Sequence, residues 1–319
     1  MIQLTDQQVR AALDWRALAA RIEDMVARDE VDCAPRAAYD LPGSGTLLLM
    51  PAWRDSSVIG LKTVTVWPDN HLFNQASHSA TYMLMDARSG VLLAVMEAHE
   101  LTVRRTAAVS AIATRRLMRP DARQLLVIGT GPVAAALIDA YAALLPFDRV
   151  QLYGRDPAKA AALAAAARDR GLACEAVADL ETAARAADVI SMATSAQAPL
   201  LRGDWLRHGT HVDLVGSFTP AMREADDRVM ARATVWVDTL AAFDACGDLL
   251  DPIASGALDR DRLGGTLRDL IVRPPARPDE AITVFKAVGY AVPDFAAAQC
   301  ALDAATPVAR PAAHLTEGV

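Results

Sequence analysis

The segment 123–134 constrains the fold of this chain more than any other part of its sequence. It reads Arg-Gln-Leu-Leu-Val-Ile-Gly-Thr-Gly-Pro-Val-Ala, so an apolar run typical of a buried strand stops at a glycine turn and an alanine-rich stretch begins at Pro132. Strand, glycine turn and helix in this order predict the first unit of a Rossmann-type doubly wound parallel sheet. Because this unit begins near the middle of a 319-residue chain, a separate domain is expected before it.

The glycine turn also predicts a dinucleotide site. Gly129 permits the tight turn, Gly131 lets a pyrophosphate approach the backbone, and Ala134 lets the helix pack closely on the strand. The free N–H groups at the start of the following helix then face the phosphates. The predicted pyrophosphate site is Gly129, Thr130, Gly131, Pro132 and Val133. The alternative is an ordinary strand–turn–helix connection that binds no nucleotide.

Composition narrows the class of partner. A net charge of −7 and a pI near 5.4 argue against nucleic acid as a partner. No apolar run reaches the roughly 18 residues of a membrane span, and the first residues lack the basic and apolar regions of a signal peptide. The four cysteines are far apart and the six histidines lack ligand spacing. We therefore expect a cytoplasmic protein with reduced thiols, no metal site and no membrane partner.

Residues 119–290 alternate strand-like and helix-like segments, which predicts an α/β domain with helices on both faces of a parallel sheet. Strands are expected at 124–128, 149–153, 188–192, 211–215, 234–238 and 282–285, and helices at 132–145, 157–170, 179–186 and 220–232.

The first 118 residues follow a different pattern. A helix is expected at 5–28, followed by strands of an antiparallel sheet at 46–50, 58–66, 80–86 and 91–96, with turns at 41–44 and 86–90. A long helix, 98–118, with Thr102 as a candidate cap, leads into the nucleotide domain, and a helix at 291–306 packs back onto the first part. The predicted division is therefore an α+β domain of 1–118 and 291–319 around a dinucleotide domain of 119–290. The Pro- and Ala-rich tail from Thr306 is expected to be mobile.

The end of the second strand bears on the choice of dinucleotide. An acidic residue there hydrogen-bonds the ribose 2′-OH of NAD, but this chain has Gly154 at that position and Arg155 directly after it. A guanidinium can bind a 2′-phosphate with two hydrogen bonds, which favours NADP(H). Two alternatives stay open: Arg155 is only a solvated residue beside the helix cap Asp156, or Asp156 itself reaches the ribose and the cofactor is NAD(H).

Several segments outside the glycine turn carry a family resemblance. They are Met50-Pro51-Ala52, Gly60-Leu61-Lys62, Pro68-Asp69-Asn70, Asp86 to Gly90, Arg105 to Ser110, Val215 to Pro220 with Arg223-Glu224, and Thr283 to Gly289 with Asp294. Together they resemble the ornithine cyclodeaminase/mu-crystallin family from about Thr5 to Ala305. The resemblance implies a dinucleotide domain inserted into a substrate domain that mediates formation of a homodimer.

The resemblance also assigns roles. Lys62, Arg105 and Arg36 correspond to residues that bind the substrate carboxylate, and Lys62 is also a candidate proton donor. Such a carboxylate site suits an α-amino or α-imino acid, whose Cα is then fixed for hydride transfer. The competing interpretations are a solubility lysine on an edge strand and surface arginines. The remaining matches lie near the cofactor: Ser77, Ala193, Thr194, Ser195, Val215 and Gly216.

Two departures from the family pattern bear on the reaction. Ornithine cyclodeaminases have carboxylates at the positions of Leu48 and Phe218, where they move protons on the substrate amines. Because an imine is already electrophilic when protonated, a reductase needs neither carboxylate. The sequence therefore favours an NAD(P)H-dependent reductase of a small α-imino acid such as pyrroline-2-carboxylate. The alternatives are an ornithine cyclodeaminase, an enzyme like alanine dehydrogenase, and a non-catalytic protein that binds NADPH and a small ligand.

Overall fold

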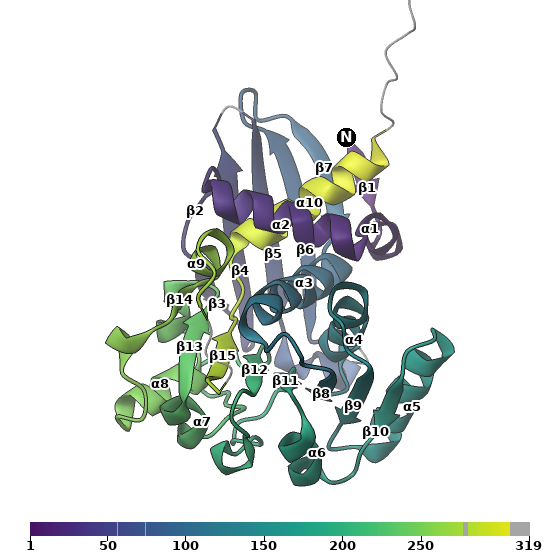
Figure 1. Cartoon of the computed structure of the whole chain (residues 1–319). Coiled ribbons are helices and arrows are strands. Elements are labelled where there is room, and N and C mark those ends of the chain that lie inside the picture. Colours follow the sequence, from purple (N-terminus) through teal and green to yellow (C-terminus); the bar gives the residue numbers. More distant parts are fainter. Residues whose placement is uncertain (56, 74, 277–279, 307–319) are drawn as a thin grey trace, which may run out of the picture.

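The computed structural model describes residues 1–55, 57–73, 75–276 and 280–306. Its strands form two separate sheets; in Figure 1 the first sheet, in purple and blue, extends from above the second sheet down behind it. The expected mobility of the tail concerns residues that lie outside the described ones. No helix in the described ranges has both the length and the apolar character that crossing a membrane requires.

The first sheet is built from the N-terminal part of the chain. Its strands are β1 (Ile2–Leu4), β2 (Asp32–Cys33), β3 (Ala37–Leu41), β4 (Gly45–Arg54), β5 (Val58–Val66), β6 (His78–Asp86) and β7 (Leu92–Glu97). The order is β1-β7-β6-β5-β4-β2, with β3 also paired to β4, and every pair except β1–β7 is antiparallel. The antiparallel sheet predicted from the sequence is thus confirmed, although β1, β2 and β3 were not predicted.

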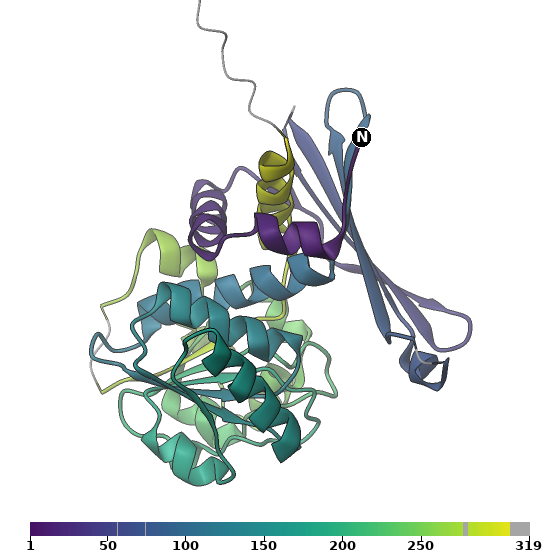
Figure 2. The same cartoon turned by 90° about the vertical axis from the view of Figure 1, so that its right-hand side faces the viewer.

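Helices cover one face of this sheet, as Figure 2 shows. They are α1 (Asp6–Ala12), α2 (Trp15–Arg28), α3 (His99–Leu117) and α10 (Ala291–Ala305). The strand register places Met50, Lys62, Tyr82 and Met96 in one row across four strands on the covered face. All four side chains are buried, so Lys62 is a charged residue within an otherwise largely apolar inner face.

The second sheet is parallel throughout. Its strands are β8 (Gln124–Ile128), β9 (Arg149–Tyr153), β10 (Cys174–Ala176), β11 (Val189–Met192), β12 (His211–Leu214), β13 (Ala233–Val237), β14 (Gly265–Thr266) and β15 (Ile282–Lys286). The order β10-β9-β8-β11-β12-β15-β13-β14 reverses direction between β8 and β11. In doubly wound sheets, ligands bind at the carboxyl ends of the strands beside such a reversal.

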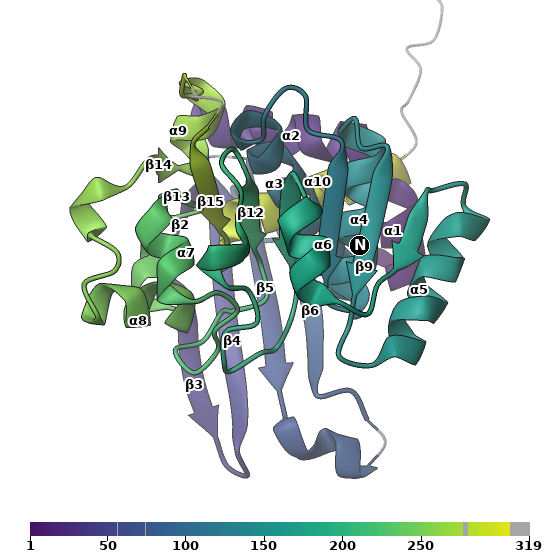
Figure 3. The same cartoon turned by 60° about the horizontal axis from the view of Figure 1, so that its bottom comes forward.

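Helices lie on both faces of the second sheet (Figure 3). Leu125 and Val127 of β8 pack with α3, α4 (Pro132–Leu144) and α5 (Pro157–Asp169). The alternate residues, Leu126 and Ile128, pack with α6 (Leu180–Ala186), α7 (Asp227–Arg232) and α8 (Gly247–Ala254). Strand residues buried on both faces account for the continuous apolar runs in the sequence. The remaining elements are α9 (Leu267–Val272), η1 (Pro68–Phe73), η2 (Gly203–Trp205), η3 (Leu240–Asp244) and η4 (Arg260–Arg262).

Three helix predictions were wrong in detail. The helix expected at 5–28 is interrupted, because the Asp14 carboxylate accepts hydrogen bonds from the N–H groups of Arg16 and Ala17 and caps a new helix. The long helix begins at His99, so Thr102 is inside it rather than at its cap. The helix expected at 220–232 is only α7, because Met222, Arg223 and Glu224 form an irregular segment held by side-chain contacts.

Helix α3 links the two sheets. Leu101 and Val109 belong to the core under the first sheet, whereas Val103 and Ala107 belong to the core of the second. Phe285 of the second sheet also packs into the core under the first. The assignment of residues 1–118 and 291–319 to one domain and 119–290 to another stays a prediction, since the two halves share this helix and part of a core.

Candidate active site

A buried carboxylate joins two of the predicted substrate residues. The Lys62 ammonium lies 2.6 Å from Oδ2 of Asp294, and the Arg105 Nε lies 2.7 Å from Oδ1 of the same carboxylate. Asp294 is fully buried in the first turn of α10, and Lys62 is only 2% exposed. The three groups come from β5, α3 and α10, so the packing of these helices on the sheet builds the contact.

The loop between β15 and α10 brings Arg36 to the same place. The Nη2 atom of Arg36 donates hydrogen bonds to the carbonyl oxygens of Val288 and Gly289, at 3.0 and 3.1 Å. The N–H groups of the same two residues donate to Oδ2 of Asp238, at 3.0 and 2.7 Å. Gly289 has a φ of +79°, and a Cβ there would lie 2.7 Å from both terminal nitrogens of Arg105. A glycine is therefore needed here for the conformation and for space.

We call Arg36, Lys62, Arg105, Asp238 and Asp294 the cation cluster. With all groups ionised it holds three cations and two carboxylates, so one positive charge is in excess. Burial, with Arg105 and Arg36 acting in the same direction, lowers the pKa of Lys62 to about 8, although Asp294 opposes the shift. Desolvation and then Arg105 lower the pKa of Arg36. The cluster therefore suits one bound monoanion, and Lys62 is a group that can release a proton near neutral pH.

The glycine turn at the end of β8 has the geometry that a dinucleotide requires. Gly129 has a φ of +130°, and a Cβ there would lie 2.4 Å from the carbonyl oxygen of Ala193, across the reversal between β8 and β11. At Gly131, the residue that caps α4, a Cβ would meet no described atom within 4 Å, and no described side chain caps the helix. The N–H groups at the start of α4, where Pro132 and Val133 lie, are thus open to an anion.

The neighbouring strand β9 ends beside this turn, where the N–H of Gly129 donates to the carbonyl of Tyr153. A Cβ on Gly154 would lie 2.4 Å from Cγ2 of Thr130, which explains why a glycine stands where an acidic ribose ligand was considered. Asp156 caps α5 by accepting from the N–H groups of residues 158 and 159. Arg155 is exposed, and within the described part of the chain the structure gives it no hydrogen bond or ion pair.

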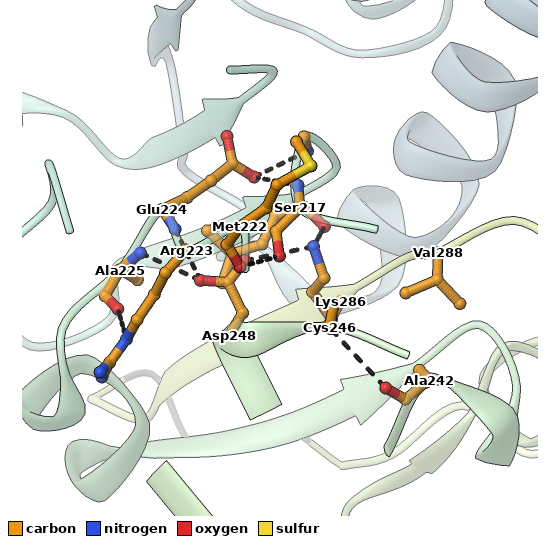
Figure 4. Close-up of polar contacts among 12 residues, drawn as sticks. Ser217, Met222, Arg223, Glu224, Ala225, Ala242, Cys246, Asp248, Lys286 and Val288 are labelled. Carbon is orange, nitrogen blue, oxygen red and sulfur yellow. Dashed lines mark hydrogen bonds and ion pairs between the residues drawn. The ribbon is translucent and has the colours of Figure 1, made fainter. Parts of the chain in front are cut away.

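The loops after β11 and β12 meet at the same edge of the sheet. Val215 donates its N–H to Met192, and a Cβ on Gly216 would lie 2.1 Å from the carbonyl oxygen of Thr194. The Glu224 carboxylate binds both loops: Oε1 accepts from the N–H and the hydroxyl of Thr194, and Oε2 accepts from the N–H groups of Gly216 and Ser217. Figure 4 shows Glu224 beside Ser217 of the second loop. Ala193 and Ser195 flank Thr194 in the first of the two loops.

Strand pairing links these loops to the cation cluster. Leu214, which ends β12, pairs with Lys286, which ends β15. The segments that follow β12 and β15 therefore leave the sheet about 4.8 Å apart. The first leads to Gly216 and the second to Val288 and Gly289. A molecule held between the loop after β12 and the loop after β15 would contact both the predicted nicotinamide site and the predicted substrate site.

Three other positions considered from the sequence, Ser77, Leu48 and Phe218, are not members of the cation cluster. Ser77 is exposed just before β6, five residues from Tyr82, the partner of Lys62, which is about 16 Å along an extended strand. The structure does not bring it against the cation cluster. Leu48 alternates with Met50 on β4 and shares the covered face. Phe218 is 49% exposed.

No role was predicted from the sequence for Asp294, Asp238 or Glu224. Asp294 is an acidic residue in the first turn of a helix that is otherwise largely apolar, and Asp238 directly follows a buried parallel strand. An acidic residue at either position could have been recognised from the sequence as a candidate buried carboxylate. Glu224 lies in an irregular segment, where no periodicity marks a buried side chain.

Comparison with known proteins gives the family. The model of the ornithine cyclodeaminase/mu-crystallin family matches residues 2–307. A Delta(1)-pyrroline-2-carboxylate reductase of Paracoccus denitrificans is 40% identical over 255 residues, which are 78% of this chain and 80% of that protein.

Solved structures agree with this result. A Delta(1)-pyrroline-2-carboxylate reductase of Thermococcus litoralis in complex with NADH and L-proline has a TM-score of 0.90 at 26% identity, with 96% of this chain and 97% of that chain covered. An archaeal alanine dehydrogenase dimer with bound NAD has a TM-score of 0.89 at 25% identity, with 96% of each chain covered. The chain therefore belongs to the ornithine cyclodeaminase/mu-crystallin family.

Proposed function

We propose that this protein is an NAD(P)H-dependent reductase of a small α-imino acid, of the kind represented by pyrroline-2-carboxylate. The observation that carries the proposal is the buried Lys62, which shares Asp294 with Arg105 in a cluster with one positive charge in excess. The excess charge matches one substrate carboxylate, and the lysine supplies a proton-releasing group beside it. The relatives named as reductases of pyrroline-2-carboxylate support the same reaction.

In the proposed reaction, the loops that contain Gly129, Thr194 and Gly216 would hold the nicotinamide cofactor, which would supply the hydride for the imine carbon. Nε of Arg105 is occupied by Asp294, so its two terminal nitrogens, which lie against Gly289, are the groups we assign to the substrate carboxylate. Arg36, which is fixed on the Gly289 loop, adds a second cation. Lys62 holds a proton for the imine nitrogen, and Asp294 keeps both cations in place.

The cyclodeaminase alternative is less well supported. The two positions at which ornithine cyclodeaminases resemble one another in having carboxylates are Leu48 and Phe218 here. Leu48 lies on the same strand face as Met50, next to the row that contains Lys62, so an apolar side chain occupies the region where an amine-handling carboxylate is expected. An apolar lining favours a cyclic imine over an ornithine side chain with a terminal ammonium.

A spectrophotometric screen tests the proposal. Purified protein is given NADH or NADPH with pyrroline-2-carboxylate, piperideine-2-carboxylate, or pyruvate with ammonia or methylamine, and ornithine is tested separately with NAD. Oxidation of the cofactor that depends on an imino acid supports the reductase. Conversion of ornithine to proline and ammonia without net change in NAD would instead show a cyclodeaminase. Reduction of pyruvate only with ammonia would indicate an alanine dehydrogenase, and binding without turnover a non-catalytic protein.

We further propose a preference for NADP(H), supported by the exposed guanidinium of Arg155 beside Gly154. Arg155→Ala is expected to weaken NADPH binding by about 1–3 kcal/mol, the range of a hydrogen bond to a charged group, and to leave NADH binding nearly unchanged. Calorimetric titration of both cofactors measures this. Arg202→Ala, which removes an exposed arginine between β11 and β12, is the control. Equal affinity of the parent protein for the two cofactors would refute the preference.

The first sheet supports a homodimer. Opposite the helix-covered face, the strand register places a set of apolar, partly exposed side chains: Leu47, Leu49, Trp53, Ile59, Leu61, Met83, Met85 and Val95. No described helix covers this face in Figure 2. A second copy that packs there would bury it, as expected for a two-fold interface. Light scattering is expected to give twice the 34.0 kDa of one chain, whereas a monomer at micromolar concentration would exclude the interface.

A further inference from the structure

The carboxylate of Glu224 is an unusually well-connected buried group outside the cation cluster. It is fully buried and accepts four hydrogen bonds, of 2.8 and 2.8 Å from Thr194 and of 2.7 and 3.2 Å from Gly216 and Ser217. Three of the donors are backbone N–H groups, which can only donate. The two oxygens are divided between the loops, one for each, so the carboxylate spans the gap between the ends of β11 and β12.

A second layer fixes Glu224 itself. Oδ1 of Asp248 accepts from the N–H groups of Glu224 and Ala225, at 2.8 and 3.1 Å. Oδ2 of Asp248 lies 3.2 Å from the Lys286 ammonium, which also donates to the carbonyl of Leu214 at the end of β12. Figure 4 shows these groups converging. Lys286 and Asp248 are fully buried. The Lys286 ammonium pairs with Asp248, and its charge also lowers the pKa of Glu224.

We propose that Glu224 is the positioning residue that holds the Thr194 and Gly216 loops together and thereby fixes the nicotinamide end of the cofactor site. This inference rests on the proposed function, because it takes the two loops to be the ones that contact the nicotinamide. Glu224 touches neither substrate nor cofactor in this role. It acts through the backbone of Thr194 and Gly216.

The arrangement has features that stability alone does not require. Burial is expensive for a carboxylate and raises the pKa of Glu224 to about 7, with Lys286 opposing the shift and Asp248 adding to it. An apolar side chain would avoid this cost. A carboxylate is suited to this place because its two oxygens can each accept from N–H groups of a different loop. A Cβ on residue 216 would also collide with the backbone of Thr194 and with Oε1 of Glu224, so only glycine fits at this position.

The test is Glu224→Gln, which keeps size and shape. A glutamine has one oxygen and one NH2, so whichever loop meets the NH2 loses its acceptor and faces another donor. We expect the dissociation constant for NADH to rise by roughly tenfold to a hundredfold, the scale for buried donors that lose an acceptor. We expect kcat to fall as well, and KM for the imino acid to stay nearly unchanged, because the cation cluster is intact. NADH fluorescence titration and steady-state kinetics give these values.

Two other buried carboxylates provide matched controls. Asp213 on β12 accepts from the hydroxyls of Tyr141 and Ser191 and binds neither loop, so Asp213→Asn is expected to leave the NADH dissociation constant unchanged even if it lowers stability. Asp238 holds the Val288–Gly289 loop instead, so Asp238→Asn is expected to raise KM for the imino acid without weakening NADH binding. If Glu224 is a positioning residue, Glu224→Gln weakens NADH binding at unchanged KM, whereas Asp238→Asn raises KM at unchanged NADH binding.

Each remaining outcome decides the matter. If Glu224→Gln does not fold, Thr194→Val replaces it: this change removes the hydroxyl that donates to Glu224 and accepts from the N–H of Ala196, and it should weaken NADH binding several-fold. Unchanged NADH affinity in the folded variant, or an equal loss in Asp213→Asn, overturns the role of Glu224. If the parent protein binds neither NADH nor NADPH, the proposed function itself fails, and the inference fails with it.

Discussion

Lys62→Met is expected to lower kcat for imine reduction by roughly tenfold to a thousandfold, which overlaps the lower part of the roughly hundredfold to ten-thousandfold that a positioned proton donor contributes. Methionine is unbranched like lysine and only one atom shorter, so it fills most of the space between Met50 and Tyr82 and largely preserves the packing of the covered face. Arg105→Leu is expected to act mainly on KM, because a carboxylate ligand binds substrate and transition state alike. Steady-state kinetics of both variants separate a proton donor from a residue that only binds. Unchanged kcat in Lys62→Met would remove Lys62 from the mechanism.

The same lysine predicts a pH dependence. Since its pKa is lowered to about 8 and reduction requires the protonated form, kcat/KM in the parent protein should fall as the pH rises through about 8. Lys62→Arg keeps the positive charge but cannot release a proton near this pH. We expect it to be slow throughout and to lose the decline above pH 8. A decline that persists in Lys62→Arg would have to come from another group, such as the imine itself.

Asp294→Asn is expected to destabilise the protein by about 3–5 kcal/mol, because it leaves two buried cations without their shared counter-ion. The variant should also change the pH profile. Asp294 raises the pKa of Lys62, so its loss moves that pKa further below its usual range, and the decline in kcat/KM shifts to lower pH. Urea denaturation measures the first effect and the kinetic pH profile the second.

Asp303→Asn is the matched control, because it makes the same chemical change on the same helix. Asp303 pairs with Arg21 at the surface, where its side chain is 61% exposed, and such pairs contribute about 0–1 kcal/mol. The control should therefore keep the stability and the pH profile of the parent. If Asp294→Asn behaves like this control, the cation cluster does not depend on Asp294.

The sequence was most informative where a single local rule decides the structure. Six strands of the second sheet (β8, β9, β11, β12, β13 and β15) were predicted from their apolar runs, whereas the short strands β10 and β14 were missed. The glycine turn after β8 was also predicted, and the position of Gly129 against Ala193 agrees with it. The short strands β2 and β3 were missed, because they are edge strands with little apolar alternation. Their existence depends on pairing with β4, which a local pattern does not reveal.

The candidate site shows the same division between local and long-range information. Lys62 and Arg105 were found through a resemblance, but the contact that joins them is made by Asp294, more than 180 residues away from Arg105 in the sequence. The segment 220–226 was expected to be helical. It is irregular instead, and the carboxylate of Glu224 within it accepts from backbone N–H groups of two other loops. Such contacts are decided by tertiary structure, which overrides the local preference of the chain.

The place of β15 has a consequence for how the chain folds as it is synthesised. Although β15 comes late in the sequence, it lies inside the second sheet, between β12 and β13. Until residues 282–286 have left the ribosome, β12 and β13 lack the strand that lies between them. Helix α10, which carries Asp294 and packs on the first sheet, has not yet been released either. Both halves are thus completed by the same short stretch of chain, at long sequence separation, which slows folding. We expect a nascent chain to remain incompletely folded, and open to chaperones, until that stretch emerges.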